Sequence, residues 1–94
     1  MVKIIEMSTP YCATCKMIAP MVQKTVAAYP ASEVSFQVLD ATQGEGAKLA
    51  AEHKVTAVPT FFFFNAAGEL AYRHTGAITA GALKSKIEEL KAAN

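Results

Sequence analysis

The chain has 94 residues, enough for one compact domain, because a single hydrophobic core usually serves about 50 to 200 residues. Hydrophobic residues make up 52% of it and charged residues 18%, so enough apolar surface is present to offset the entropy lost on folding, which argues against disorder. The formal net charge of +1 is too small to attract a polyanion, so nucleic acid is not an expected partner.

The apolar stretches indicate neither export nor membrane insertion. Near the start only Val2, Ile4 and Ile5 form an apolar run, interrupted by a lysine, and this is too short for the hydrophobic region of a signal peptide. No segment reaches the roughly 20 apolar residues that a membrane span needs. We therefore expect a cytoplasmic protein with no membrane partner. In that reducing compartment a cysteine pair is more often redox-active or metal-binding than a permanent cross-link.

The first two predicted elements are a strand and a helix. Residues 2–7 have the pattern of a short apolar strand, in which Glu6 is the anomaly. Residues 8–11 include a proline and break the strand, and apolar residues then recur at helical spacing from residue 12 onward. This helix should end near Tyr29, because that residue precedes a proline and so disfavours helical dihedrals.

The next segment predicts an edge strand and a second helix. Residues 34–39 alternate between apolar and polar side chains at first, which is the period-two pattern of a strand with one polar face. Thr42 and Glu45 have the spacing of a capping box. A helix is therefore expected to begin there and to end before Val55.

The last third of the chain predicts a hairpin and an amphipathic helix. Four phenylalanines at 61–64, bounded by turn signals, indicate a strand that is buried on both faces. A turn at 65–68 leads into an antiparallel strand over 69–74. The final helix is predicted to have Thr79 as its N-cap and an ion pair between Lys84 and Glu88. Its apolar face comprises Leu83, Ile87 and Leu90.

The order of these elements, βαβαββα, defines an α/β fold class. Right-handed crossovers place the first two strands parallel, in a four-stranded mixed sheet with helices on both faces. We expect a single domain over residues 1–94.

Both cysteines lie in one motif, Cys12-Ala13-Thr14-Cys15. If a helix begins there, the two-residue gap places the second thiol one turn from the first, close enough for a disulfide. Cys12 would face the unsatisfied N–H groups and the positive dipole end of the helix, which favour a thiolate. We therefore predict that Cys12 attacks substrates. Cys15, more buried, would be the resolving thiol, the one that attacks the resulting mixed disulfide.

A lone CxxC motif has two other interpretations, half of a zinc site or a pair of inert core thiols. Zinc needs two further ligands, and His53 and His74 are the only histidines. They lie on different predicted elements without the short spacing typical of zinc sites, so we predict no metal.

Several motifs in register resemble the thioredoxin family. The stretch CKMIAP from Cys15 to Pro20 is similar to the continuation of the active-site helix in bacterial thioredoxins, including its proline. Residues 58–60 resemble the family's cis-proline loop, and Gly76-Ala77 resembles the glycine-containing loop beside the active site. Together these motifs cover residues 2–91 and imply a minimal thioredoxin fold.

The resemblance implies a substrate-binding surface around the cysteine pair. Its residues precede the first cysteine or lie on the two loops: Tyr11, Val58, Pro59, Thr60 and Gly76. An X–Pro bond adopts the cis form far more readily than other peptide bonds, and a cis bond would turn the start of the strand sharply enough to expose backbone groups. Val58 would then pair with an extended substrate through its main chain.

The resemblance also gives Glu6 a role. It lies six residues before Cys12, where similar thioredoxins carry a buried aspartate. A carboxylate that is desolvated beneath the cysteines would have a raised pKa and would accept the proton of Cys15 as that thiol attacks. In the alternative interpretation the longer glutamate reaches solvent at the strand end and has no catalytic role.

Three departures from the family pattern bear on redox potential and partner choice. Ala13-Thr14 replaces the usual Gly-Pro, and Tyr11 replaces the tryptophan before the first cysteine. The first strand and helix of most thioredoxins are missing, which should leave residues 34–39 as an exposed edge.

We expect an enzyme, a monomeric thiol–disulfide oxidoreductase that reduces oxidised protein substrates, in electron transport and cell redox homeostasis. A flavoenzyme resembling thioredoxin reductase would re-reduce it, and the chain itself needs no cofactor. One alternative is a glutaredoxin-like enzyme that uses glutathione, which the shortened start favours. The other is a redox-inert binding module with the same fold. Both cysteines, Pro59 and Glu6 argue against the inert module, and the segments 16–20 and 58–61 favour a thioredoxin over a glutaredoxin.

Overall fold

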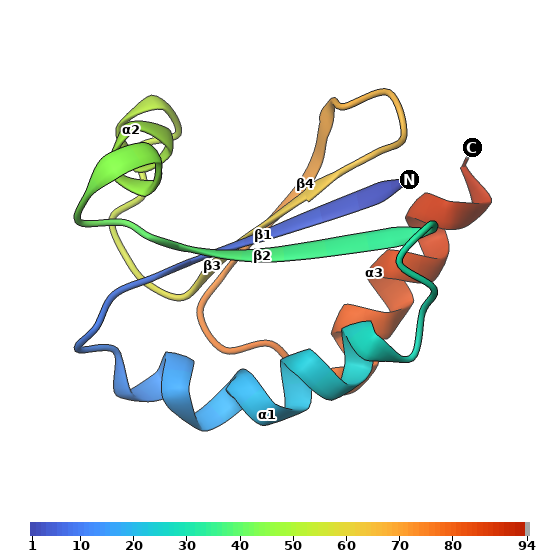
Figure 1. Ribbon diagram of the computed structural model, residues 1–94, viewed down its shortest axis with the longest axis horizontal. Coiled ribbons are helices and arrows are strands. Elements are labelled where there is room, and N and C mark those ends of the chain that lie inside the picture. Colours follow the sequence, from blue (N-terminus) through green and yellow to red (C-terminus); the bar gives the residue numbers. More distant parts are fainter. Residues whose placement is uncertain (94) are drawn as a thin grey trace.

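The computed structural model describes residues 1–93, so residue 94 of the predicted domain lies outside the described part. The elements follow the predicted order (Figure 1): β1 (Val2–Ser8), α1 (Ala13–Ala27), β2 (Val34–Asp40), α2 (Gly44–Glu52), β3 (Thr60–Phe64), β4 (Leu70–Thr75) and α3 (Ala80–Ala92). Within residues 1–93, no helix is both long and apolar enough to cross a membrane.

The strands form one mixed sheet in the order β2-β1-β3-β4. β1 and β2 are parallel, from Val2 opposite Val34 to Ser8 opposite Asp40. β3 is antiparallel to both β1 and β4. α1 and α3 cover one face of the sheet and α2 covers the other (Figure 1). The predicted four-stranded fold with helices on both faces is confirmed, and β2 is an edge strand as expected.

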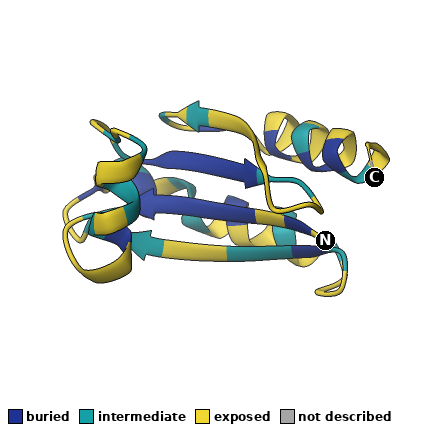
Figure 2. Cartoon of the chain, turned by 90° about the horizontal axis from the view of Figure 1, so that it is seen from above, coloured by how far each residue is buried: buried dark blue, intermediate teal, exposed yellow. Residues whose placement is uncertain are grey.

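The core lies on both faces of the central strands. Figure 2 shows β1 and β3 buried over most of their length, whereas β4 is mostly exposed and β2 is mostly of intermediate exposure. Phe61 and Phe63 pack with α1 and α3, and Phe62 packs on the opposite face with the residues beneath α2. This division explains why the strand is continuously apolar, because neither face of it meets water.

The predicted capping box of the second helix is wrong. The N-cap of α2 is Gln43, and its side chain makes no capping hydrogen bond. The Thr42 hydroxyl instead donates to a carboxylate oxygen of Asp40 at 2.6 Å. Asp40 ends β2 and also accepts from the Thr42 backbone N–H. These two bonds hold Thr42 in the turn after β2, and the helix begins one residue later than the capping box requires.

The last helix confirms the predicted cap but not the predicted ion pair. The Thr79 hydroxyl accepts a hydrogen bond from the backbone N–H of Ala82, as an N-cap does. Lys84 and Glu88 form no ion pair within the described part of the chain; both border a surface hollow beside Tyr29. The ion pair in this helix joins two other residues, Lys86 and Glu89.

Close packing of α2 on the end of β2 makes Gly46 a sensitive position. Gly46 is buried, and an added Cβ atom would collide with the backbone carbonyl of Asp40. We expect Gly46→Ala to lower the free energy of unfolding by about 1 to 3 kcal/mol, because backbone must shift. Gly81→Ala in α3 is the matched control, since nothing lies within 4 Å of its added Cβ; it should stabilise by about 0.5 to 1 kcal/mol. Urea unfolding measures both, and equal stabilities would contradict the prediction.

Candidate functional site

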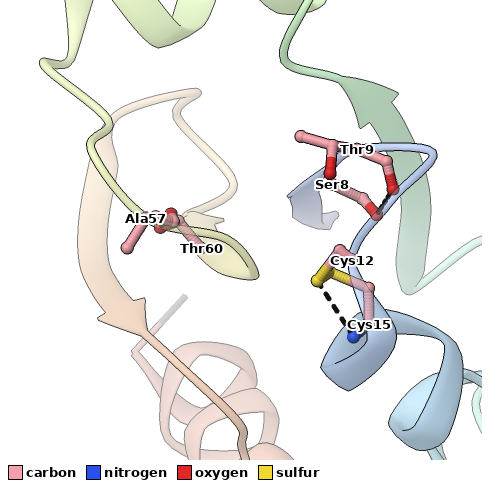
Figure 3. Close-up of a disulfide and its surroundings, with 6 residues drawn as sticks. All are labelled: Ser8, Thr9, Cys12, Cys15, Ala57 and Thr60. Carbon is pink, nitrogen blue, oxygen red and sulfur yellow. Dashed lines mark hydrogen bonds between the residues drawn. A yellow bond between two sulfur atoms is a disulfide. The ribbon is translucent and has the colours of Figure 1, made fainter.

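The cysteine motif forms a disulfide at the start of α1. Cys12 is the N-cap residue with an extended backbone, and its sulfur accepts a hydrogen bond from the backbone N–H of Cys15 at 3.1 Å. The two Cα atoms lie 5.3 Å apart and the sulfurs are bonded. The geometry predicted from the two-residue gap is therefore confirmed (Figure 3).

The roles of the two cysteines are distinguished more clearly by their positions at the helix terminus than by their burial. Their exposed fractions are 8% for Cys12 and 5% for Cys15, so the expected difference in shielding is small. Cys12, however, already receives a backbone hydrogen bond at the positive end of the helix dipole. The first turn contains no acidic residue, so no negative charge there opposes a thiolate on Cys12.

Glu6 lies under the cysteine pair, on the face of β1 that α1 covers. It is 3% exposed, which excludes the interpretation in which its side chain reaches solvent. Its side chain and Cys15 line the same hollow, of about 200 Å³, between α1 and the sheet. Burial raises the pKa of the Glu6 carboxyl to about 7, so at neutral pH the carboxyl is poised both to hold and to accept a proton.

The two loops predicted to bind substrate are joined to each other. The Val58–Pro59 peptide bond is cis, as predicted, and the Pro59 carbonyl accepts a hydrogen bond from the backbone N–H of Gly76 at 2.7 Å. Gly76 has a φ of +95°, a conformation that favours glycine. Thr60 pairs with Met7, which places the turn at the sheet end from which the chain leads to the cysteines. Figure 3 shows this turn across from them.

The predicted contact residues differ widely in exposure. Tyr11, next to the first cysteine, is 91% exposed and so free to meet a partner. Val58 is half-buried and packs on the cluster beneath α2. The Thr60 side chain is fully buried, and its hydroxyl donates to the Ala57 carbonyl at 2.6 Å. The Thr60 side chain is therefore not available for contact with a partner; it shapes the turn that is predicted to bind substrate.

The Thr60 hydroxyl can be tested by two substitutions. Thr60→Val keeps the shape of the side chain but leaves the Ala57 carbonyl without its donor, a loss of about 1 to 3 kcal/mol. We expect this variant to raise the KM for a protein disulfide several-fold while leaving kcat within about twofold, since the cysteines are untouched. Thr60→Ser retains the donor and should restore the KM. A normal KM for Thr60→Val would show that the hydroxyl does not shape the binding turn.

The two histidines make their contacts with other parts of the chain and not with the cysteines. His53 packs against Phe62 with the two rings tilted and their centroids 4.9 Å apart, and His74 hydrogen-bonds the Ala77 carbonyl. Over residues 1–93, no group of three or more His, Cys, Asp or Glu side chains is placed to hold a metal ion. The chemistry that the arrangement offers is that of the two thiols.

Sequence reasoning missed the residues around Glu6 and Cys15. Lys16, Ala19 and Gln23 come from α1 and Ser8 from β1, and all four line the hollow. A signal for three of them was present, because positions 16, 19 and 23 share one face of a helix.

The fold and the site together define a protein of the CxxC class, in which a reversible disulfide caps a helix on a mixed sheet. The thioredoxin family model matches residues 2–89. The chain is 32% identical over 91 residues to thioredoxin-1 of Saccharomyces cerevisiae, covering 97% of this chain and 79% of that protein. It therefore belongs to the thioredoxin family.

Other similarities agree. A thioredoxin-like protein of Acanthamoeba polyphaga mimivirus is 35% identical over 85 residues, and the match covers 90% of this chain but only 60% of the viral protein. The crystal structure of oxidised mitochondrial thioredoxin 3 from Saccharomyces cerevisiae superposes with a TM-score of 0.79 at 31% identity, covering 95% of this chain and 78% of the other.

Proposed function

We propose that the protein reduces disulfides in oxidised protein substrates by dithiol exchange. The observation that carries this proposal is the placement of three groups. The Cys12 sulfur is at the helix N-cap, Cys15 is bonded to it, and the Glu6 carboxyl lies beneath them along the same hollow. These are an attacking thiol, a resolving thiol and a proton acceptor.

The reaction begins with the reduced protein. The Cys12 thiolate attacks one sulfur of the substrate disulfide, forming a mixed disulfide and releasing the other substrate sulfur as a thiolate. Cys15 then attacks the Cys12 sulfur, passing its proton to the Glu6 carboxylate. The second substrate thiolate leaves, and the Cys12–Cys15 disulfide forms. Two electrons have passed from the protein to the substrate.

The surface around the disulfide would bind the substrate. The exposed Tyr11 directly precedes Cys12, and the turn that contains Val58 and Pro59 lies across from the cysteines (Figure 3). An extended peptide would lie along the Val58 main chain, with Gly76 supporting the turn. We further propose that the protein works as a monomer in the cytoplasm, in electron transport and redox homeostasis. It would bind no cofactor of its own and be re-reduced by a flavoenzyme of the thioredoxin reductase type.

A coupled assay tests the proposal. Catalytic amounts of the protein are given insulin as the disulfide substrate, with electrons supplied either by NADPH and a thioredoxin reductase or by glutathione and glutathione reductase. We expect turnover with the flavoenzyme and little with glutathione. Preference for glutathione would support the glutaredoxin-like alternative. No turnover with either, for a chain whose disulfide opens under dithiothreitol, would support a redox-inert module.

A further inference from the structure

The hollow that holds the Glu6 carboxyl opens at the side of the molecule, along the edge of β2. One wall is formed by α1 and the other by β1 and β2. Its lining comprises Glu6, Ser8, Cys15, Lys16, Ala19, Val22, Gln23, Phe36 and Val38. Within residues 1–93 β2 is the edge strand of the sheet, so this side of the hollow lies along an unpaired strand edge. Val38, on this edge, is 51% exposed.

The Glu6 carboxyl depends on this hollow for contact with water. Glu6 is 3% exposed, and burial alone accounts for its raised pKa. The groups that face it from β2 and β3 are apolar, namely Phe36, Val38 and Phe61. On the α1 side, Cys15 and Lys16 line the hollow beside the Glu6 carboxyl. Lys16 is the other charged residue among those that line it.

The opposite approach to the carboxyl is blocked during the reaction. In the mixed disulfide the substrate is bonded to Cys12 and covers the face that carries Tyr11 and the Pro59 turn. Because the pKa of Glu6 is about 7, about half of these carboxyls carry a proton at pH 7, and such a carboxyl must give that proton to water before it accepts the one from Cys15. While the mixed disulfide persists, that proton needs a path that does not cross the covered face.

We propose that the hollow beside the β2 edge is a lateral entrance through which the Glu6 carboxyl exchanges its proton with water while a substrate covers Cys12. The space, about 200 Å³, accommodates several water molecules at about 30 Å³ each. Ser8, Lys16 and Gln23 supply the polar groups that bound water requires. This inference rests on the proposed role of Glu6 as proton acceptor.

Filling the entrance tests it. Ala19→Leu places a larger side chain in the hollow from α1, and Val38→Trp covers the opening from the exposed edge. The Glu6 carboxyl is titrated by carbon NMR in the oxidised protein. We expect its midpoint to rise by about one pH unit in either variant, because the charged form loses water. Ala27→Leu, at an exposed position of α1, and Tyr72→Trp, on the opposite edge strand, are the matched controls and should leave it unchanged.

A kinetic measurement separates the two chemical steps. Ellman's reagent releases one coloured thiolate when Cys12 attacks and a second when Cys15 resolves the mixed disulfide. At pH 7 the filled variants should resolve about fivefold more slowly, because less of the Glu6 is ionised. Capture by Cys12 should be unchanged.

The outcomes distinguish this proposal from the proposed function. An unchanged midpoint in both filled variants, or equal slowing of capture and resolution, would overturn the lateral entrance. If the midpoint rises but resolution does not slow, water does enter here while Glu6 is not the proton acceptor; that result overturns the catalytic use of the entrance and the role of Glu6 together. If Ala19→Leu does not fold, Val38→Trp still tests the entrance, because Val38 is half-exposed and its substitution does not disturb the core.

Discussion

Cys15→Ser will trap protein substrates as mixed disulfides, whereas Cys12→Ser will trap none. The thiolate at the helix N-cap attacks first, so the first bond to a substrate forms at Cys12. Cys15, with its Cα 5.3 Å from that of Cys12, is the group placed to break this bond. Without it the intermediate persists, and multiple-turnover reduction should fall by about 1,000-fold or more, as losses of an essential nucleophile do.

The comparison of the two variants tests the assignment of roles and not only the need for two thiols. Each variant is incubated with a disulfide-linked protein, and the adducts are separated without reductant. Cys12→Ser retains a thiol of similar burial, so a lack of adducts there would reflect its position and not its inaccessibility. Adducts with Cys12→Ser and none with Cys15→Ser would reverse the roles and refute the argument from the helix terminus.

The features of the fold that the sequence predicts are those set by local periodicity. The phenylalanines at 61–64 indicated a strand buried on two faces, and the structure divides them between two cores. The predicted capping box was wrong, and the spacing of Thr42 and Glu45 alone does not reveal why. Whether Thr42 caps a helix depends on where its side chain and backbone are held, and Asp40 holds both in the turn that follows the end of β2.

The site divides in the same way. The positions of Cys12 and Cys15 follow from a helix start. The burial of Glu6 was implied only by the family resemblance, and it arises because β1 is a central strand with both faces covered. The burial of the Thr60 side chain was not predicted, because a polar residue directly after a proline is typical of an exposed loop. The hollow beneath Cys15 depends on how far α1 stands from an unpaired strand edge, which no motif records.

Glu6→Gln will slow the resolution of the mixed disulfide by about 100-fold or more at pH 8, the usual contribution of a general base. The amide has nearly the shape of the carboxyl but does not accept a proton from Cys15. Capture by Cys12 should be little changed, because that thiol owes its reactivity to the helix terminus. In the unsubstituted protein the resolution rate should rise through about pH 7, following the pKa of Glu6; in Glu6→Gln this rise should disappear.

The same substitution should stabilise the protein at alkaline pH, which distinguishes loss of a base from damage to the fold. The folded chain raises the pKa of Glu6 from 4.5 to about 7, so the folded state binds the proton more tightly than the unfolded state does. The contribution of Glu6 to the free energy of unfolding is therefore present in full below pH 4.5. It is lost as the pH rises through about 7, by on the order of 3 kcal/mol. Glutamine does not ionise, so Glu6→Gln should lack this loss. Urea unfolding at pH 4 and pH 8 measures it. A variant that resolves slowly and is also less stable at pH 8 would indicate that position 6 supports packing, and not proton transfer.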